Sequence, residues 1–271
     1  MSVKSIHSSR SINIFLIAAL CSVTILSCSP SATNSPPSAQ KAVATSPVSP
    51  VASRTDPGFK LLFDGVRTDN WRMSTVNNQP GADPGHFVVV NGTLEAIAGN
   101  TLGLYWCTNP TPPDFILKLE WMTSRISDNS GVFIRFPNPD SKGYANTALV
   151  GVDYGFEVQI DNLGKPDGAA KHKTGAIYNL AGPQHADTLP LHPPGQWNLF
   201  EIRVQGQTYT ISLNGQQITL FHFVVGSDHQ HPDRGLPTTS SVPRFIGLQT
   251  HPGSSSIYFR NIQIKALDGT P

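Results

Sequence analysis

The stretch Tyr154-Gly155-Phe156-Glu157-Val158-Gln159-Ile160-Asp161 alternates apolar and polar residues, as a half-buried β-strand does. One face of this predicted strand carries the three large apolar side chains and points toward a core. The other face carries Glu157, Gln159 and Asp161, spaced roughly 7 Å apart by the rise of a strand. Two acids and an amide in a row are typical either of a solvated sheet face or of a ligand site.

Two more predicted strands also place polar residues on one of their two faces. This repetition favours a ligand site over an ordinary solvated face. The two strands are Asn129-Ser130-Gly131-Val132-Phe133-Ile134-Arg135, with Asn129 and Arg135 on one face, and Phe245-Ile246-Gly247-Leu248-Gln249-Thr250-His251, with Gln249 and His251 together. A sheet that gathers arginine, carboxylate, amide and imidazole groups on one face predicts a polar groove for a ligand.

The charge balance excludes a nucleic-acid partner. The 271-residue chain has 19 Lys and Arg against 18 Asp and Glu, and only 14% of its residues are charged. Removal of residues 1–27 would take away Lys4 and Arg10 and leave 17 basic residues against 18 acidic ones. No basic stripe remains to attract a phosphate backbone.

The amino terminus predicts export and lipid anchoring. Lys4 and Arg10 precede an apolar run from Ile12 to Leu26, which is short for a membrane-spanning helix and typical of a signal peptide at residues 1–27. The run ends at Ile25-Leu26-Ser27-Cys28, which resembles a bacterial lipobox. We therefore expect acylation of Cys28 and a protein tethered to the cell envelope by lipid, without a spanning helix. A plain signal peptide with an incidental cysteine is the alternative.

The remaining cysteines predict no disulfide. Cys21 leaves with the signal peptide and Cys28 would be acylated, so Cys107 has no partner. Its neighbours Tyr105 and Trp106 favour a small core side chain at this position.

Composition divides the rest of the chain in two. Residues 28–57 are rich in Ser, Pro, Ala and Thr and cannot bury enough apolar surface to order, so they predict a flexible tether. Residues 58–267 form many short alternating segments separated by turns, with no amphipathic helix of convincing length. They predict one all-β domain, a concanavalin A-like jelly-roll sandwich of two antiparallel sheets.

Three local signals fix turns and an irregularity in that domain. Asn91-Gly92 and Asn214-Gly215 each predict a tight hairpin. In the last strand the apolar parity switches between Phe259 and Ile262, which predicts a β-bulge near Arg260-Asn261. The Pro-, Gly- and Asn-rich segment 137–152 predicts an irregular excursion before the strand that begins at Gly155.

A set of motifs in order along residues 58–266 resembles the 3-keto-disaccharide hydrolase domain family. The motifs are Leu62-Phe63-Asp64-Gly65 with Trp71, Asp114-Phe115 with Leu117 and Leu119-Glu120-Trp121, Asn129-Ser130-Gly131-Val132-Phe133 with Arg135, Glu157-Val158-Gln159-Ile160, Lys173-Thr174-Gly175-Ala176-Ile177-Tyr178, Pro193-Pro194-Gly195-Gln196-Trp197-Asn198, Leu213-Asn214-Gly215, Gly247-Leu248-Gln249 and Phe259-Arg260-Asn261-Ile262. The resemblance implies a concanavalin-like jelly roll and cleavage of glycosides oxidised to a ketone at carbon 3. This chain departs from the family at Thr250-His251-Pro252, where Asp and then His-Gly are common, and in the long loop from His222 to Val242.

The implied chemistry assigns roles to the polar face. A ketone at carbon 3 acidifies the hydrogen on carbon 2, so the site needs a base, a group that stabilises the ketone oxygen and an acid for the leaving group. The predicted catalytic residues are Glu157 as acid/base, Arg135 at the oxygen and His251 as a second proton carrier. The predicted substrate-binding residues are Asn129, Gln159, Asp161, Lys173 and Gln249, with Tyr178 or Trp121 stacking on the sugar. No cofactor and no metal are predicted.

Other interpretations of the same residues stay open. Arg135 and Glu157 can form a structural ion pair, and Trp121 shares the parity of core residues. A retaining glycosidase would use Glu157 and Asp161, but their Cα atoms lie about 13 Å apart along a strand, too far for carboxyl groups that must approach within about 5–5.5 Å. A lectin-like carbohydrate-binding module would use the same groove. A divalent-metal site would draw on His229, His231, His222 and Asp228.

Overall fold

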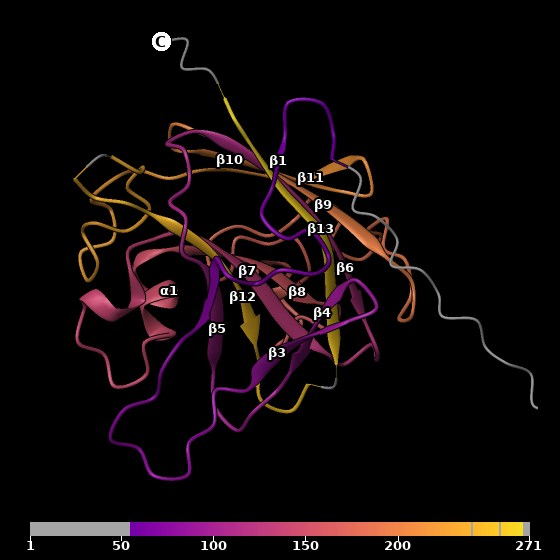
Figure 1. The fold of residues 1–271 in the computed structure, drawn as a ribbon. Helices are drawn as coiled ribbons and strands as arrows, with labels where there is room; N and C mark the ends of the chain where they lie inside the picture. Colours follow the sequence, from indigo (N-terminus) through magenta and orange to yellow (C-terminus); the bar gives the residue numbers. More distant parts are fainter. Residues whose placement is uncertain (1–54, 240, 255, 268–271) are drawn as a thin grey trace, which may run out of the picture. The chain divides into compact units, whose positions relative to one another are not determined.

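The computed structural model describes residues 55–239, 241–254 and 256–267 (Figure 1). The predicted signal peptide at residues 1–27, the lipidation site Cys28 and residues 29–54 of the predicted tether lie outside the described residues. Within the described part of the chain, no helix has the length and hydropathy needed to cross a membrane.

Two antiparallel sheets form the structure, so the predicted all-β sandwich is confirmed. The larger sheet has the order β11-β10-β9-β6-β13-β4-β3, and β1 also pairs with β13. Its strands are β1 (Lys60–Leu61), β3 (His86–Val90), β4 (Thr93–Ile97), β6 (Phe115–Thr123), β9 (Asn198–Gln205), β10 (Thr208–Leu213), β11 (Gln216–His222) and β13 (Ile257–Ala266). The smaller sheet has the order β2-β5-β12-β7-β8, from β2 (Trp71–Met73), β5 (Gly103–Cys107), β12 (Phe245–Thr250), β7 (Asn129–Phe136) and β8 (Phe156–Asp161).

The main core lies between the two sheets and follows the period-two pattern of the sequence. In β8 the apolar residues Phe156, Val158 and Ile160 are buried in it. Trp121 of β6 is fully buried in the same core, so the predicted stacking of Trp121 on a sugar is wrong. Cys107 is free and buried in this core, which confirms that it is a small core side chain.

The predicted turns and the predicted bulge are confirmed. Asn91 and Gly92 have φ values of 50° and 80° between β3 and β4, and Asn214 and Gly215 have 50° and 84° between β10 and β11. Consecutive residues with positive φ are the signature of a tight hairpin turn that matches the twist of its strands. In β13 the pairing with β6 shifts between Arg260 and Gln263, because β13 holds one extra residue there.

The segment after β7 contains two short helices rather than only irregular chain. They are η1 (Pro139–Ser141) and α1 (Leu149–Tyr154), and a third short helix, η2 (Ala170–His172), follows β8. Tyr154 therefore ends a helix, and the Gly155 N–H caps it by donating to the Gly151 carbonyl at 3.0 Å. The strand begins at Phe156, one residue later than the predicted start at Gly155.

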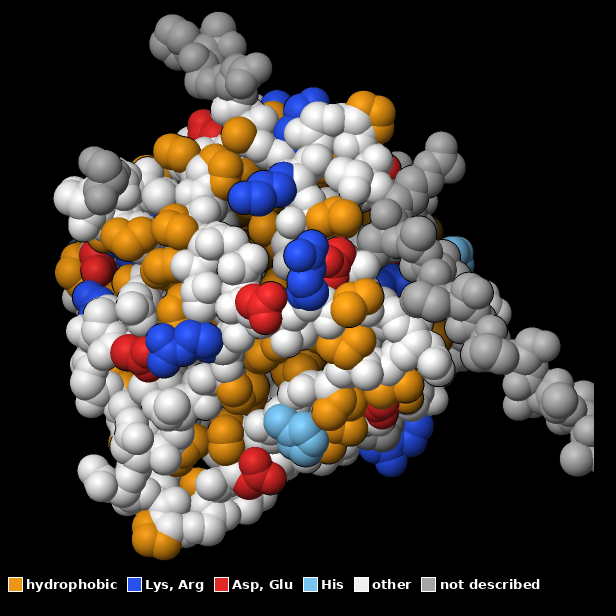
Figure 2. All heavy atoms as spheres, viewed as in Figure 1, with side chains coloured by type: hydrophobic (Ala, Val, Ile, Leu, Met, Phe, Trp, Pro, Cys, Tyr) orange, Lys and Arg blue, Asp and Glu red, His pale blue; other side chains and the backbone are white. Residues whose placement is uncertain are grey.

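Helix α1 packs on the outer face of the small sheet and partly covers it. A second apolar cluster forms there, made of Leu104, Trp106, Phe133, Phe136, Ala148 and Phe245. Helix α1 and this cluster cover one part of the outer face. The polar residues occupy the part around Glu157. On the molecular surface shown in Figure 2, acidic and basic side chains lie close to one another instead of forming a continuous basic area.

Candidate functional site

Glu157 lies on β8, an edge strand of the small sheet, and its side chain reaches over Gly131 of β7 on the outer face. Its neighbours Phe156 and Val158 are buried in the core on the opposite face, so the strand alternation turns its carboxyl group outward. The Gln249 amide on β12 donates from Nε2 to Glu157 Oε1 at 2.7 Å. Burial nevertheless dominates and raises the pKa of Glu157 from an ordinary 4.5 to about 8, while the Gln249 hydrogen bond acts weakly in the other direction.

Gly131 of β7 makes the space that the Glu157 carboxyl occupies. A Cβ atom at Gly131 would lie 2.1 Å from Glu157 Oε1 and 2.7 Å from its Cγ. Such distances are far below contact, so any side chain at this position would displace the carboxyl group. A glycine inside a strand often marks a close approach of this kind, and this is the signal in the sequence by which the role of Gly131 could have been predicted.

Amide side chains surround the carboxyl group. Gln159 is assigned the amide orientation in which its nitrogen donates to Glu157 Oε1 at 3.0 Å and to the Ser130 carbonyl at 3.1 Å. Oε1 thus accepts from two amides, and within the described residues nothing hydrogen-bonds to Oε2. The Gln249 amide oxygen is buried and has no hydrogen-bond partner within the same described residues.

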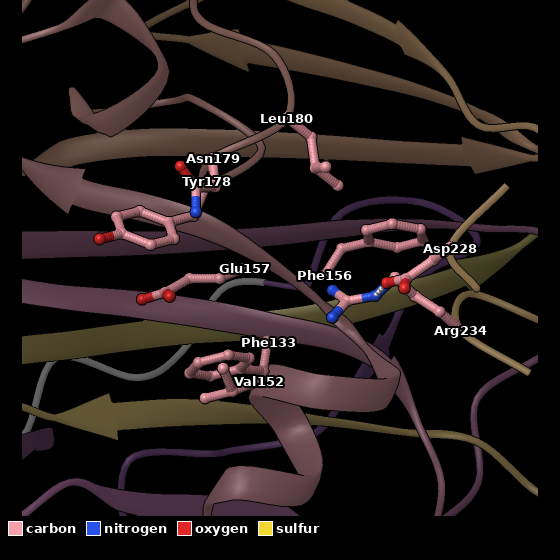
Figure 3. Close-up of a pocket in the computed structure, with 9 residues that line it drawn as sticks. All are labelled: Phe133, Val152, Phe156, Glu157, Tyr178, Asn179, Leu180, Asp228 and Arg234. Atoms are coloured by element: carbon pink, nitrogen blue, oxygen red, sulfur yellow. Dashed lines mark ion pairs between the residues drawn. The ribbon is translucent and has the colours of Figure 1, made fainter. Parts of the chain in front are cut away.

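Two adjoining hollows meet at Glu157, Tyr178 and Val152. The smaller hollow, of about 170 Å³, is lined in addition by Leu102, Asn129, Gln159, Gln249 and His251. The larger hollow, of about 260 Å³, is lined in addition by Phe133, Phe156, Asn179, Leu180, Asp228 and Arg234 (Figure 3). In Figure 3 the Tyr178 hydroxyl and the Glu157 carboxyl group point in the same direction.

Six of the predicted site residues therefore line one concave surface. Tyr178 follows the small 3-10 helix η2, and burial raises the pKa of its phenol, so it remains a proton donor. His251 lies just after β12, with Nδ1 2.9 Å from the Pro252 carbonyl oxygen. That contact assigns the proton to Nδ1 and leaves Nε2 as an acceptor when the ring is neutral. The residues brought together are Asn129, Glu157, Gln159, Tyr178, Gln249 and His251.

Arg135 does not lie at the site, and its predicted role at the ketone oxygen is wrong. Its guanidinium is buried and donates to the carbonyl oxygens of Gly206 and Pro113, each at 2.6 Å, and to the Tyr209 hydroxyl at 3.1 Å. These partners belong to the region around β6, β9 and β10, so Arg135 ties the two sheets together. The alternative ion pair with Glu157 is also absent, since the carboxylate nearest to Arg135 is that of Asp114 at 3.3 Å.

Asp161 and Lys173 are also engaged elsewhere. Asp161 is fully buried, and its two carboxylate oxygens accept from the backbone N–H groups of Leu163, Gly164 and Lys165 in the turn after β8. The Lys173 ammonium pairs with Asp187. Neither residue lines the two hollows, so the prediction that they bind the substrate is not supported by this geometry. Asp161 contributes indirectly, because its Oδ2 accepts from the Asn129 amide at 3.2 Å.

Two charged residues of the site were not predicted as ligands of a sugar. Arg234 and Asp228 come from the long loop after β11 and form an ion pair at 2.7 Å at one end of the larger hollow. Arg234 also donates to the Gly155 carbonyl at 3.0 Å, which fixes the loop against the beginning of β8. The length of this loop was the signal in the sequence, but the loop contains no periodicity that shows where it folds.

The histidine-rich loop does not gather metal ligands in this structure. His231 Nε2 lies 3.9 Å from Asp153 Oδ1, while Asp228 is taken by Arg234. His222 on β11 lies beside Thr208, with 3.2 Å between its Nδ1 and the hydroxyl oxygen. Across residues 55–239, 241–254 and 256–267, no group of three or more His, Cys, Asp or Glu side chains is arranged to hold a metal ion.

Residues 58–265 match the family model of the 3-keto-alpha-glucoside-1,2-lyase-like domain. Among solved structures, a candidate glycosyl hydrolase from Parabacteroides distasonis ATCC 8503 superposes with a TM-score of 0.60 at 22% identity, covering 80% of this chain and 100% of that chain. A second candidate glycosyl hydrolase from the same organism gives a TM-score of 0.51 at 26% identity, covering 73% of this chain and 100% of that chain. No curated protein sequence matches this chain.

Proposed function

Because this chain belongs to the 3-keto-alpha-glucoside-1,2-lyase-like domain family, we propose that it cleaves glycosides that carry a ketone at carbon 3. The observation that carries the proposal is the partly buried Glu157 carboxyl group at the junction of two hollows, held by amide donors on Oε1 and free at Oε2. Such a group can take and return a proton beside a bound sugar.

The proposed reaction is an elimination followed by addition of water. Ionised Glu157 removes the proton from carbon 2, and the electron pair of that C–H bond forms a double bond between carbons 1 and 2. The bond between carbon 1 and its oxygen substituent breaks, and the leaving oxygen takes its electron pair and a proton from an acid. Water then adds across the double bond to give the free 3-keto sugar, so that the sum of the two steps is hydrolysis.

The raised pKa of Glu157 suits this proton transfer. A carboxylate with an ordinary pKa is a weak base toward a carbon acid, and a base is most effective when its pKa lies near the working pH. With a pKa of about 8, the ionised form is a stronger base and is still populated at neutral pH. The ketone also makes carbon 2 acidic enough for a carboxylate to act.

Other residues of the smaller hollow complete the proposed mechanism. Tyr178, which keeps its phenolic proton, donates a hydrogen bond to the ketone oxygen as negative charge develops there. His251, when its ring is protonated on both nitrogens, gives the Nε2 proton to the leaving oxygen, and the neutral ring that results takes a proton back at Nε2 from the attacking water. Asn129 and Gln249, which line the same hollow, bind sugar hydroxyls.

Product analysis tests the proposal directly. We expect the purified domain to release the alcohol from a methyl 3-keto-glucoside and, in deuterated water, to place deuterium on carbon 2 of the recovered sugar, as seen by NMR. An inverting or retaining hydrolysis would leave the hydrogen on carbon 2 in place. Binding of intact oligosaccharides without any turnover of 3-keto-glycosides would instead favour the lectin-like module.

The rate of cleavage is expected to rise with pH through the pKa of Glu157. Its pKa is raised, so the carboxyl group is protonated below about pH 8 and becomes a base above it. kcat/KM should therefore rise by about tenfold per pH unit from pH 6 and level off above pH 8, and this rise should vanish in Glu157→Gln. Initial rates from pH 6 to 9 provide the measurement, and a plateau that already begins at pH 5 would contradict the assignment.

A further inference from the structure

The structure fixes the amide orientation of Asn179, an exposed residue that lines the larger hollow. Its Oδ1 lies 3.0 Å from the Lys171 ammonium nitrogen and 3.1 Å from His172 Nε2. An ammonium group only donates hydrogen bonds, so the atom that faces it is the amide oxygen and not the amide nitrogen. In Figure 3 the amide nitrogen lies on the side of Tyr178 and Glu157, so it is the donor that Asn179 offers to the hollow.

His172 is itself held through its other ring nitrogen. The residue is 5% exposed, and its Nδ1 lies 2.7 Å from Asp167 Oδ1. Both ring nitrogens therefore face oxygen atoms, and both contacts are hydrogen bonds only when the ring carries two protons, because a neutral imidazole has a single N–H to donate. The Ala169 N–H and then the His172 ring lower the pKa of Asp167, so its carboxylate stays ionised. The Asp167 carboxylate thus holds a protonated His172 as a donor to Asn179.

The backbone of Asn179 is constrained as well. Its φ of 66° lies in the left-handed region, which asparagine adopts more readily than most other residues with a side chain. Its N–H donates to the Lys171 carbonyl at 3.0 Å, and the Tyr178 N–H donates to the Glu157 carbonyl at 2.9 Å. The His172 ring also packs against the Tyr178 ring, with 5.1 Å between the centroids. These contacts give the Asn179 carboxamide a fixed position beside the strand that carries Glu157.

We infer that Asn179 is a ligand-binding residue whose Nδ2 donates a hydrogen bond to a hydroxyl oxygen of the sugar that occupies the larger hollow, and that Lys171 and His172 position it. The inference rests on the proposed function, since it takes the smaller hollow to hold the oxidised ring and the larger one to hold the sugar that leaves. With its oxygen engaged by two donors, the amide offers this sugar only N–H groups. A donor that is already ordered also loses little conformational entropy on binding.

Asn179→Gly tests the contact, because glycine adopts a φ of 66° without strain and only the carboxamide is lost. Asn91→Gly is the matched control, since Asn91 has a φ of 50° in the turn between β3 and β4 and lies outside both hollows. The probes are the unoxidised sugars maltose, whose two rings can fill both hollows, and methyl α-glucoside, which has one ring. NMR titration of the purified protein measures the affinity for each.

The wild-type protein should bind maltose more tightly than methyl α-glucoside. Asn179→Gly should weaken the binding of maltose by about fivefold, the usual effect of one hydrogen bond, and that of methyl α-glucoside by less than about twofold. Asn91→Gly should change neither affinity. An unchanged affinity for maltose in Asn179→Gly, an equal loss for both sugars, or a wild-type protein that binds maltose no better than methyl α-glucoside would overturn the inference.

His172→Phe and Lys171→Met test the positioning. Phenylalanine keeps a ring against Tyr178 but has no N–H, and Lys171 is exposed, so its replacement puts little of the fold at risk. Each variant should weaken the binding of maltose by about threefold in the wild-type background and leave it unchanged in the Asn179→Gly background, because a positioning residue acts only through the side chain that it holds. Equal losses in both backgrounds would show a merely structural role and overturn this part of the inference.

The use of unoxidised sugars separates the inference from the reaction itself. If no 3-keto-glycoside is cleaved but maltose binding shows this pattern, the proposed reaction fails and Asn179 stands as a ligand-binding residue. If a 3-keto-disaccharide is cleaved, and both its KM and the affinity for maltose are unchanged in Asn179→Gly, the inference fails and the proposed reaction stands.

Discussion

Replacement of Glu157 by glutamine is expected to lower the turnover number on a 3-keto-glucoside by about 10²–10⁴-fold, the usual effect of removing a general acid–base group. Glutamine keeps the size of the side chain and an oxygen that can accept from the Gln249 amide, which lies 2.7 Å from Glu157 Oε1. It loses only the ability to take a proton. KM for the 3-keto substrate, and the affinity for the unoxidised glycoside, should therefore change by less than about threefold.

The control for this variant is Glu201→Gln, because Glu201 lies on β9 of the large sheet, away from both hollows. It should leave the turnover number unchanged. If Glu157→Gln weakens binding and leaves turnover intact, Glu157 is a sugar ligand and the base has to be sought at His251. Deuterium exchange at carbon 2 gives a second measurement, since it should be lost together with turnover in Glu157→Gln.

The alternation of residues in β8 was sufficient to predict both the sandwich and the centre of the site. Period two places Phe156 and Val158 in the core and Glu157 on the opposite face, and the structure keeps this arrangement through the whole strand. The same rule placed Asn129 and Gln249 beside Glu157, because their strands β7 and β12 are regular at these positions.

The rule failed at Arg135 because the strand is irregular there. Phe245 pairs with Phe136 while Ile246 pairs with Ile134, so Arg135 is an extra residue in β7 with no partner on β12. Its φ of 57° turns the backbone, and the side chain leaves the face that parity assigns to it. A single sequence contains no signal for this bulge, because arginine rarely adopts positive φ and no glycine marks the position.

The positions of loop residues could not be predicted from the alternation of apolar and polar residues, for a different reason. Arg234 and Asp228 reach the site only because the long loop after β11 folds back onto the beginning of β8, through the hydrogen bond from Arg234 to the Gly155 carbonyl. Asp161 shows the opposite case. Alternation along β8 assigns Asp161 to the same face as Glu157. However, Asp161 is the last residue of β8, and its carboxylate accepts hydrogen bonds from N–H groups of the turn that follows.

Replacement of Arg135 by methionine is expected to lower the free energy of unfolding by about 3–5 kcal/mol, since a buried acceptor that loses its donor costs about 1–3 kcal/mol and several acceptors lose theirs. The acceptors include the carbonyl oxygens of Gly206 and Pro113 and the Tyr209 hydroxyl. Methionine fills a similar volume, so the loss reports the polar contacts more than a cavity. Urea denaturation should show a lower midpoint with an unchanged slope.

Arg203→Met is the matched control, because Arg203 lies on β9 and its side chain donates a hydrogen bond to the exposed Gln205 amide oxygen at 3.1 Å. Its effect should stay within about 0.5 kcal/mol. The folded fraction of Arg135→Met should keep a turnover number within about threefold of the wild type, because the guanidinium points between the sheets and not into either hollow. A stable Arg135→Met protein whose turnover falls by 10² or more would restore Arg135 to the chemistry, and Tyr178 would then lose its place at the ketone oxygen.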